Sequence, residues 1–315
     1  MIQNKPKVIA VCGPTASGKT WLGVELALLL DGEIVSADSM QIYKGMDIAS
    51  AKPTEAEKKG VPHHLMNFLD RDVTFSAADY VRLAHEKIKD ILSRGKMPII
   101  VGGTGLYIDS LLNNVNFSEV KSDEEYRKSL YDFAAENGNE ALYERLLKAD
   151  PEAAEQIHMN NLVRVIRALE VIHVTGRKFS DLKAESRLVE SPYDSLIIGL
   201  NAADRSVLYD RINQRVDEMV KAGLVDEARE LWQSPPMKTA ANAIGYKELI
   251  PYFENEMTLG ECIDKIKQET RRYAKRQLTW FRRNDSIEWV IIDDFGKKCE
   301  IFEKCKKAIA KYGIM

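Results

Sequence analysis

The segment from Gly13 to Thr20 has the sequence GPTASGKT, which matches the phosphate-binding pattern GxxxxGK[ST] at every fixed position. The apolar run Val8–Cys12 precedes it, and leucines at helical spacing follow it. In such a loop the glycines let backbone amides turn toward phosphate oxygens, and the start of the next helix adds partial positive charge. The sequence therefore predicts a diphosphate or triphosphate site, without deciding between them, formed by Gly13, Pro14, Thr15, Ala16, Ser17, Gly18, Lys19 and Thr20.

Three side chains near this loop have expected chemical tasks. Lys19 is expected against the outer phosphates, and the Thr20 hydroxyl is expected to hold Mg²⁺. Asp38 follows a second apolar run, Ile34–Ala37. Because the carboxyl ends of parallel strands face the ligand crevice, Asp38 is the candidate acid opposite the loop. A helix cap or a plain surface acid is the alternative interpretation of Asp38.

A basic segment, Lys265–Arg283, lies far along the chain. It holds eight Lys and Arg residues against one acid, Glu269, in a protein whose net charge is −3. Lys267, Arg271 and Lys275 recur at steps of four, which places them on one face of a helix. This pattern favours contact with a nucleic-acid backbone, although a solvated charged face is the alternative.

The elements that must position these residues follow a clear order. Short β-rich runs alternate with helical patterns through the first hundred residues, which is typical of a parallel α/β sheet. Helical patterns alone then cover 124–136, 140–148 and 162–174, before strands at 196–200 and 289–292 and helices at 205–221 and 258–283. We therefore expect an α/β fold, a P-loop NTPase-like parallel sheet flanked by helices with an all-helical insertion domain. The predicted limits are 1–115 for the first part of the core, 116–187 for the insertion and 188–315 for the rest.

Composition excludes several classes. The 315 residues are 45% hydrophobic and carry 45 Lys and Arg against 48 Asp and Glu, so neither disorder nor a histone-like nucleic-acid binder is expected. No apolar run approaches the roughly 18 residues that span a bilayer. The four cysteines show no CxxC spacing, which favours a reduced, cytoplasmic protein. The pair His63-His64 is expected at a strand edge rather than on a metal.

Seven segments in the same order resemble the tRNA dimethylallyltransferase family. The resemblance runs from residue 8 to about residue 283 and is most specific in the second segment, DSMQIYKGMDI at residues 38–48. The seven segments are residues 13–20, 38–48, 51–53, 102–107, 167–170, 244–246 and 275–280. It implies transfer of a dimethylallyl group from dimethylallyl diphosphate to the exocyclic N6 amine of the adenosine immediately 3′ of the anticodon, with Mg²⁺ required. The partners would then be the anticodon stem-loop of tRNA and the prenyl donor, without a membrane, and we expect a monomer.

The resemblance also assigns roles to individual residues. Asp38 would take the proton of the amine, Thr104 would hydrogen-bond near the reacting oxygen, and Arg215 would stabilise the departing diphosphate. Contacts with the RNA would come from Asp38, Ser39, Met40, Gln41, Thr104, Arg127, Arg164, Arg167, Lys275 and Arg276. Asn160-Asn161 stand where some relatives carry Gln-Arg, so no RNA contact is expected from these two.

Two other functions remain open from the residues alone. A small-molecule kinase could use ATP in the loop and Asp38 to deprotonate a hydroxyl, but it has no use for the basic segment. A non-catalytic RNA-binding module would leave the intact GKT motif unexplained.

Overall fold

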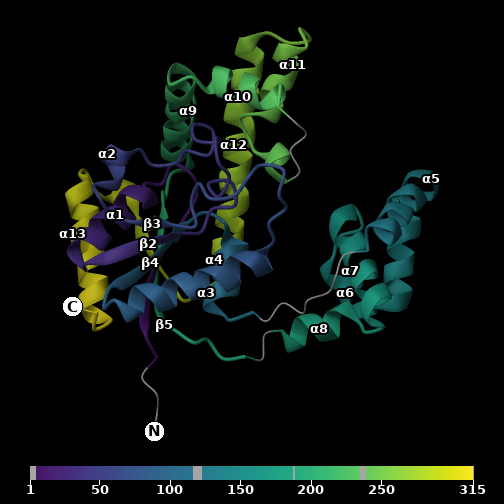
Figure 1. Ribbon diagram of the computed structural model, residues 1–315, viewed down its shortest axis with the longest axis horizontal. Helices are drawn as coiled ribbons and strands as arrows, with labels where there is room; N and C mark the ends of the chain where they lie inside the picture. Colours follow the sequence, from purple (N-terminus) through teal and green to yellow (C-terminus); the bar gives the residue numbers. More distant parts are fainter. Residues whose placement is uncertain (1–4, 116–122, 187–188, 235–238, 315) are drawn as a thin grey trace. The chain divides into compact units, whose positions relative to one another are not determined.

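A parallel sheet forms the centre of the protein in the computed structural model, which describes residues 5–115, 123–186, 189–234 and 239–314 (Figure 1). Its six strands within these residues lie in the order β3-β2-β4-β1-β5-β6. Their bounds are β1 Lys7–Cys12, β2 Gly32–Ser36, β3 His63–His64, β4 Met97–Gly102, β5 Asp194–Asn201 and β6 Ile287–Ile291. Ile9 of β1 lies opposite Ile99 of β4, which in turn lies opposite Ile34 of β2. The central strands are continuous apolar runs because helices cover both of their faces.

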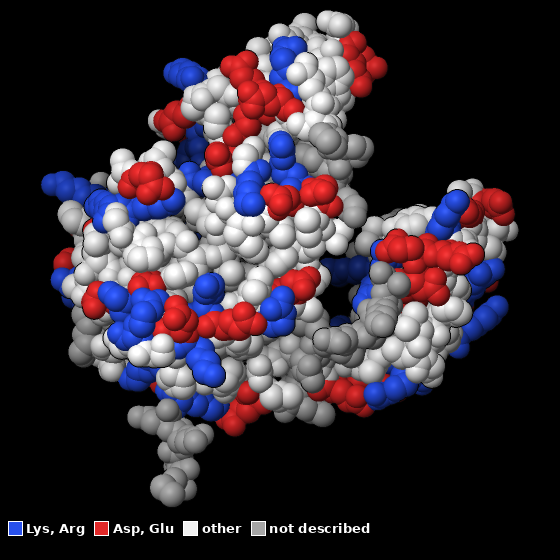
Figure 2. All heavy atoms as spheres, in the orientation of Figure 1, with Lys and Arg blue, Asp and Glu red and all other residues white. Residues whose placement is uncertain are grey.

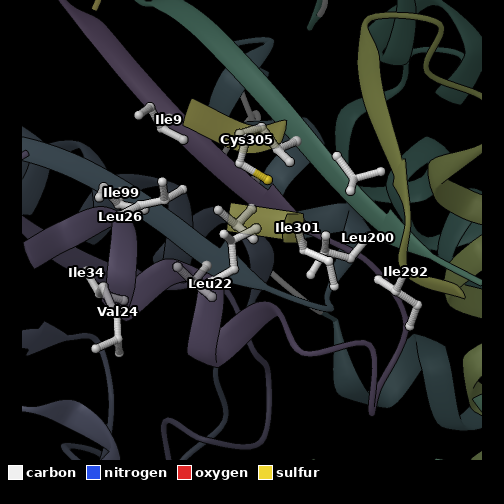
Figure 3. Packing of buried hydrophobic residues seen from close by; sticks show 14 of the residues in the cluster. Ile9, Leu22, Val24, Leu26, Ile34, Ile99, Leu200, Ile292, Ile301 and Cys305 are labelled. Carbon is white, nitrogen blue, oxygen red and sulfur yellow. The ribbon is translucent and has the colours of Figure 1, made fainter. Parts of the chain in front are cut away.

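Helices of the first unit flank this sheet. Helix α1 and helix α13 pack on one side, whereas α3 packs against β2 and β4 from the other (Figure 1). In Figure 3 the side chains of Leu26 and Ile99 lie together, and Ile301 of α13 lies near Leu200 of β5. The helices of this unit are α1 Lys19–Leu29, α2 Glu55–Lys58, α3 Ala77–Ser93, α4 Gly105–Leu112, α9 Arg205–Lys221, α10 Leu224–Trp232, α11 Ile250–Phe253, α12 Leu259–Phe281 and α13 Lys298–Lys311.

Local sequence explains where several of these helices begin. Ser76 starts α3 with a capping box, in which its hydroxyl accepts from the Asp79 amide at 3.1 Å and Asp79 accepts from the Ser76 amide at 3.0 Å. Thr258 and Glu261 form the same reciprocal pair at the start of α12. Both helices were predicted from the spacing of their residues, whereas α2, α4, α10 and α11 were not predicted.

The chain divides into two compact units, Met1–Leu112 with Pro192–Met315, and Asn113–Ser191. The second unit is helical where it is described, with α5 Glu124–Ala149, α6 Pro151–Gln156, α7 Leu162–Thr175 and α8 Phe179–Glu185. Helix α5 contains the predicted segments 124–136 and 140–148, which meet at Gly138, where φ is 86°. The predicted limits of the insertion, residues 116 and 187, lie outside the described residues.

Basic and acidic side chains are mixed on the surface. Lys and Arg side chains are interspersed with Asp and Glu side chains over the face drawn in Figure 2, in keeping with the 45 Lys and Arg and 48 Asp and Glu residues of the sequence. Among the helices described, none is both long enough and apolar enough to cross a membrane.

Candidate active site

A cavity of about 260 Å³ opens at the carboxyl end of the sheet in the first unit. The phosphate loop, the turn after β2, α9 and α12 supply its walls. Its lining includes most of the residues predicted to act in this unit, namely Thr15, Lys19, Thr20, Asp38, Ser39, Met40, Gln41, Arg215 and Arg276. The remaining loop residues, Thr104 and Lys275 do not line it.

The phosphate loop joins β1 to α1 as the motif predicts. Gly18 has a φ of 95°, a left-handed conformation that glycine adopts without strain, and α1 begins at the next residue. Lys19 folds back over the loop, and its Nζ donates to the carbonyl oxygen of Pro14 at 3.1 Å. Burial and the guanidinium of Arg215 lower the pKa of Lys19 to about 8, while Asp38 acts in the opposite direction. An anion bound in the loop would favour the charged form of Lys19 again.

Asp38 lies in the tight turn that follows β2. Its Oδ1 accepts hydrogen bonds from the amides of Met40 at 2.9 Å and Gln41 at 3.4 Å. Both bonds use Oδ1, so within the described part of the chain Oδ2 stays available to accept a proton. The amide of Ser39 donates to Thr104 Oγ1 at 3.0 Å, which ties this turn to the end of β4. Asp38 is thus both a turn cap and a cavity acid.

Arg215 reaches the phosphate loop from α9. Its Nη1 donates to Thr15 Oγ1 at 3.4 Å, and burial lowers the pKa of its guanidinium, an effect that Asp38 opposes. Arg211, one turn earlier on the same helix, is exposed and does not line the cavity.

Helix α12 packs directly over the site through a buried glutamine. Gln277 Oε1 accepts from the Thr15 amide at 2.8 Å, and its Nε2 donates to the Gly103 carbonyl at 2.9 Å. A methyl group at Gly103 would overlap Gln277, and one at Gly105 would overlap Trp280, so this close approach requires glycine. Gln277 was missed at the sequence level, although the segment KRQLTW that contains it was part of the family resemblance.

The segment after the Asp38 turn is held by a carboxylate of α10. Glu227 accepts the amides of Asp47, Ile48 and Ala49 at 2.8 to 3.2 Å, and the Tyr246 hydroxyl donates to it at 2.6 Å. This carboxylate therefore holds in place the cavity wall formed by residues 49–51. Nothing in the local sequence singled out Glu227, because the backbone amides that it accepts lie about 180 residues earlier and Tyr246 lies 19 residues later.

Gln41 is oriented by the same wall. Its Nε2 donates to the carbonyls of Ser50 at 3.1 Å and Ala51 at 3.2 Å. Its Oε1 accepts from Ser36 Oγ at 3.2 Å. The side chain predicted to contact a base is therefore held in one orientation by the protein itself.

The prediction that Lys267, Arg271 and Lys275 form one basic face of α12 for nucleic acid is only partly correct. Lys267 binds Asp217 Oδ1 at 2.6 Å, and Arg271 donates to Asn213 Oδ1 at 2.6 Å, so both are engaged with α9. Lys275 and Arg276 are exposed, and Arg276 also lines the cavity. The four-residue spacing predicts that Lys267, Arg271 and Lys275 share one face of the helix. It could not show that α9 packs along the part of this face that holds Lys267 and Arg271.

In the second unit, two of the arginines predicted to bind RNA share one buried acid. Arg127 donates to Glu170 at 3.0 Å and Arg167 donates to it at 2.7 Å, while Glu170 is fully buried. Arg164 is exposed on the same helix as Arg167. Glu170 also accepts from the Asp123 amide at 3.0 Å, so this cluster holds the start of α5 against α7.

His63 and His64 occupy the edge strand β3, as expected. His64 pairs with the buried Glu33 at 2.7 Å. Across the described residues, the side chains of His, Cys, Asp and Glu form no group of three that could hold a metal.

Comparisons with known proteins agree with this geometry. The family model of IPP transferase matches residues 41–284. The chain is 48% identical over 309 residues to a tRNA dimethylallyltransferase of Thermoanaerobacter sp. (strain X514), with 97% of each covered. It is 51% identical over 305 residues to another from Geobacillus thermodenitrificans (strain NG80-2), with 96% of each covered.

Solved structures give the same result. A tRNA isopentenylpyrophosphate transferase from Bacillus halodurans matches with a TM-score of 0.70 and 45% identity over 98% of both chains. A eukaryotic dimethylallyltransferase acting on tRNA matches with a TM-score of 0.81 and 30% identity, covering 97% of this chain and 78% of that one. These neighbours have a P-loop NTPase-like fold, so the predicted fold class is confirmed.

Proposed function

This chain belongs to the IPP transferase family and transfers a dimethylallyl group to tRNA; we propose that the donor is dimethylallyl diphosphate and the acceptor the N6 amine of the adenosine immediately 3′ of the anticodon. The observation that carries the finer proposal is that Lys19, Asp38 and Gln41 line the same cavity. It joins a phosphate cradle to a carboxylate and to a fixed side-chain amide.

The acceptor amine needs a base. Its lone pair is delocalised into the purine ring, so it is a poor nucleophile until a proton is removed. Asp38 Oδ2 takes that proton while the nitrogen forms a bond to C1 of the prenyl group. The bond from C1 to the diphosphate oxygen breaks, and its electron pair stays on the diphosphate.

The phosphate loop stabilises the charge that develops on the leaving group. The ammonium of Lys19, the loop amides and the guanidinium of Arg215 surround the expected position of the diphosphate before reaction. Preorganised cations of this kind lower the barrier because they need no rearrangement as the charge grows. The buried position of Lys19 makes its charge more effective once an anion is present.

The donor set around Thr20 fits Mg²⁺. The cation prefers oxygen ligands, keeps several waters and binds through one or two protein groups together with phosphates. Thr20 and Ser36 line the cavity and offer hydroxyl oxygens. When bound there, the metal would neutralise charge on the diphosphate.

Contact with RNA is proposed for five arginine and lysine side chains, of which Arg164, Lys275 and Arg276 are exposed and Arg127 and Arg167 are partly buried beside Glu170. Lys275 and Arg276 would contact phosphates, and Arg164 with the Arg127–Arg167 pair would bind the anticodon stem-loop. The target adenine must leave its stack to reach the cavity, as base-modifying enzymes generally require. A tRNA substrate, together with four cysteines that are free in this structure, supports a cytoplasmic location.

A donor competition tests this function. Unmodified tRNA transcript would be incubated with the enzyme, Mg²⁺ and either labelled dimethylallyl diphosphate or ATP labelled on its terminal phosphate. We expect label in tRNA only from the prenyl donor. Phosphoryl transfer from ATP without prenyl transfer would instead establish the kinase alternative, which the comparisons do not support.

A further inference from the structure

Tyr273 is an aromatic residue of α12 that lines the cavity together with Thr15, Lys19 and Asp38. We propose that its phenol is a further catalytic group, which donates a hydrogen bond to the oxygen that separates from the prenyl carbon. The proposal rests on the proposed function and adds a residue to its site.

The hydrogen bonds of Tyr273 place its phenol between the two halves of the reaction. Its phenol is within hydrogen-bonding reach of both Thr104 and Gln277, and these two bonds lower its pKa. Gln277 binds the Thr15 amide of the phosphate loop, and Thr104 binds the Ser39 amide beside Asp38. The bond that breaks must run from a diphosphate in the loop to a carbon facing the amine beside Asp38. The phenol thus lies beside the expected position of the bridging oxygen.

The phenol stays protonated in this environment. Burial raises the pKa of Tyr273, and the negative charge of Asp38 raises it further. A neutral phenol can donate a hydrogen bond to a developing oxyanion. Such a bond strengthens as charge grows on the oxygen, so it stabilises the transition state more than the bound donor.

The electron and proton balance does not require Tyr273 to give up its proton. The amine proton moves to Asp38, the nitrogen–carbon bond forms, and the carbon–oxygen electron pair stays on the diphosphate. Tyr273 donates a hydrogen bond to that oxygen throughout and keeps its own hydrogen.

The test compares Tyr273→Phe with Tyr107→Phe. Tyr107 is a matched control because it is also buried near Asp38, where it stacks on Tyr80 at 4.2 Å, but it does not line the cavity. Single-turnover transfer should fall about 10- to 100-fold in Tyr273→Phe, the effect of one lost hydrogen bond to a charged group, and should change less than about twofold in Tyr107→Phe.

Binding measurements separate this role from a structural one. The donor's bridging oxygen is an ester and a weak acceptor, whereas the released diphosphate carries the full charge. Tyr273→Phe should therefore lower the affinity of the enzyme for inorganic diphosphate about tenfold. Its affinities for the donor and for tRNA should stay within about threefold of those of the wild type. Equal losses for diphosphate and donor, or an unchanged single-turnover rate, would overturn the proposal. Failure of the wild-type enzyme to transfer the prenyl group would instead refute the proposed function.

Discussion

Gln277 and Thr15 are 262 positions apart in the chain, yet the glutamine Oε1 accepts the threonine amide at 2.8 Å. The same side chain donates to the Gly103 carbonyl, so one residue of α12 ties the phosphate loop to the end of β4. Lys275 and Arg276, which we propose to contact RNA, lie next to it in the same helix. Helix α12 therefore connects the proposed RNA surface directly to the donor site.

Replacing Gln277 should remove the link between the phosphate loop and the end of β4. In Gln277→Ala the Thr15 amide and the Gly103 carbonyl would be buried without the hydrogen bonds that Gln277 provides. We expect a loss of about 1–3 kcal/mol in the free energy of unfolding, together with weaker donor binding. Chemical denaturation and donor titration measure both effects. Gln268→Ala, on the exposed side of the same helix, is the control and should change neither.

Asp38→Asn tests the proposed base while preserving the turn, because Asn keeps an Oδ1 that can accept the amides of Met40 and Gln41. Single-turnover transfer should fall by about 10²- to 10⁴-fold, the usual contribution of a positioned base. The affinity for tRNA should remain within a few fold. A rate close to that of the wild type would remove Asp38 from the mechanism.

The buried ammonium of Lys19 predicts a pH dependence of donor binding. Its pKa of about 8 in the free protein should rise when a diphosphate binds, since the anion favours the charged form. The affinity for the donor should thus be highest below pH 8 and fall as the pH increases above that value. Binding at pH 8.5 should be accompanied by proton uptake. Calorimetry in buffers of different ionisation enthalpy measures this uptake. Lys19→Met should bind weakly and lose it, and an uptake that persists in Lys19→Met must come from another group.

Glu227 offers a test of how the cavity wall is held. Glu227→Gln weakens a carboxylate that accepts three backbone amides and the Tyr246 hydroxyl, so we expect a loss of about 1–3 kcal/mol in stability. The KM for tRNA should rise because the wall also orients Gln41. Glu230→Gln, on the exposed side of the same helix, is the matched control. Equal effects of the two substitutions would show that Glu227 has no special role.

Salt dependence distinguishes the two parts of the basic helix. Removing both Lys275 and Arg276 by alanine substitution should reduce the slope of log affinity for tRNA against log salt by about two, roughly one for each lost phosphate contact. Removing both Lys267 and Arg271 should leave the slope nearly unchanged, because these side chains are engaged with Asp217 and Asn213. The reverse pattern would place the RNA on the α9 side of the helix.

Local sequence was sufficient for the parts of the fold with strong local signals. The strand, loop and helix around Gly13–Thr20 follow from apolar runs, glycines and a motif, and α3 and α12 follow from the spacing of their residues. Such signals lie within a few residues of the element that they specify. Asp38 could be placed near the loop because the carboxyl ends of parallel strands meet at one edge of the sheet, whereas the order of the strands was not predicted.

The rest of the site depends on packing between distant segments. Tyr273 and Gln277 belong to the site only because α12 crosses the glycines after β4. The pairing of Lys267 and Arg271 with α9 likewise depends on which face of α12 that helix covers. The burial of Glu170 between two arginines could not be deduced from the residue types, since each of the three is common on a helix surface.

The most direct measurement is to map the product on the RNA. Wild-type enzyme, dimethylallyl diphosphate and an unmodified tRNA transcript would be incubated, and the RNA digested and analysed by mass spectrometry. We predict one N6-(dimethylallyl)adenosine, immediately 3′ of the anticodon, whose initial rate of formation falls about 10²- to 10⁴-fold with Asp38→Asn and which is absent when that adenosine is replaced by guanosine. A prenyl group elsewhere in the RNA, or formation by Asp38→Asn at a rate close to that of the wild type, would contradict the proposal that the phosphate loop and Asp38 act together on this adenine.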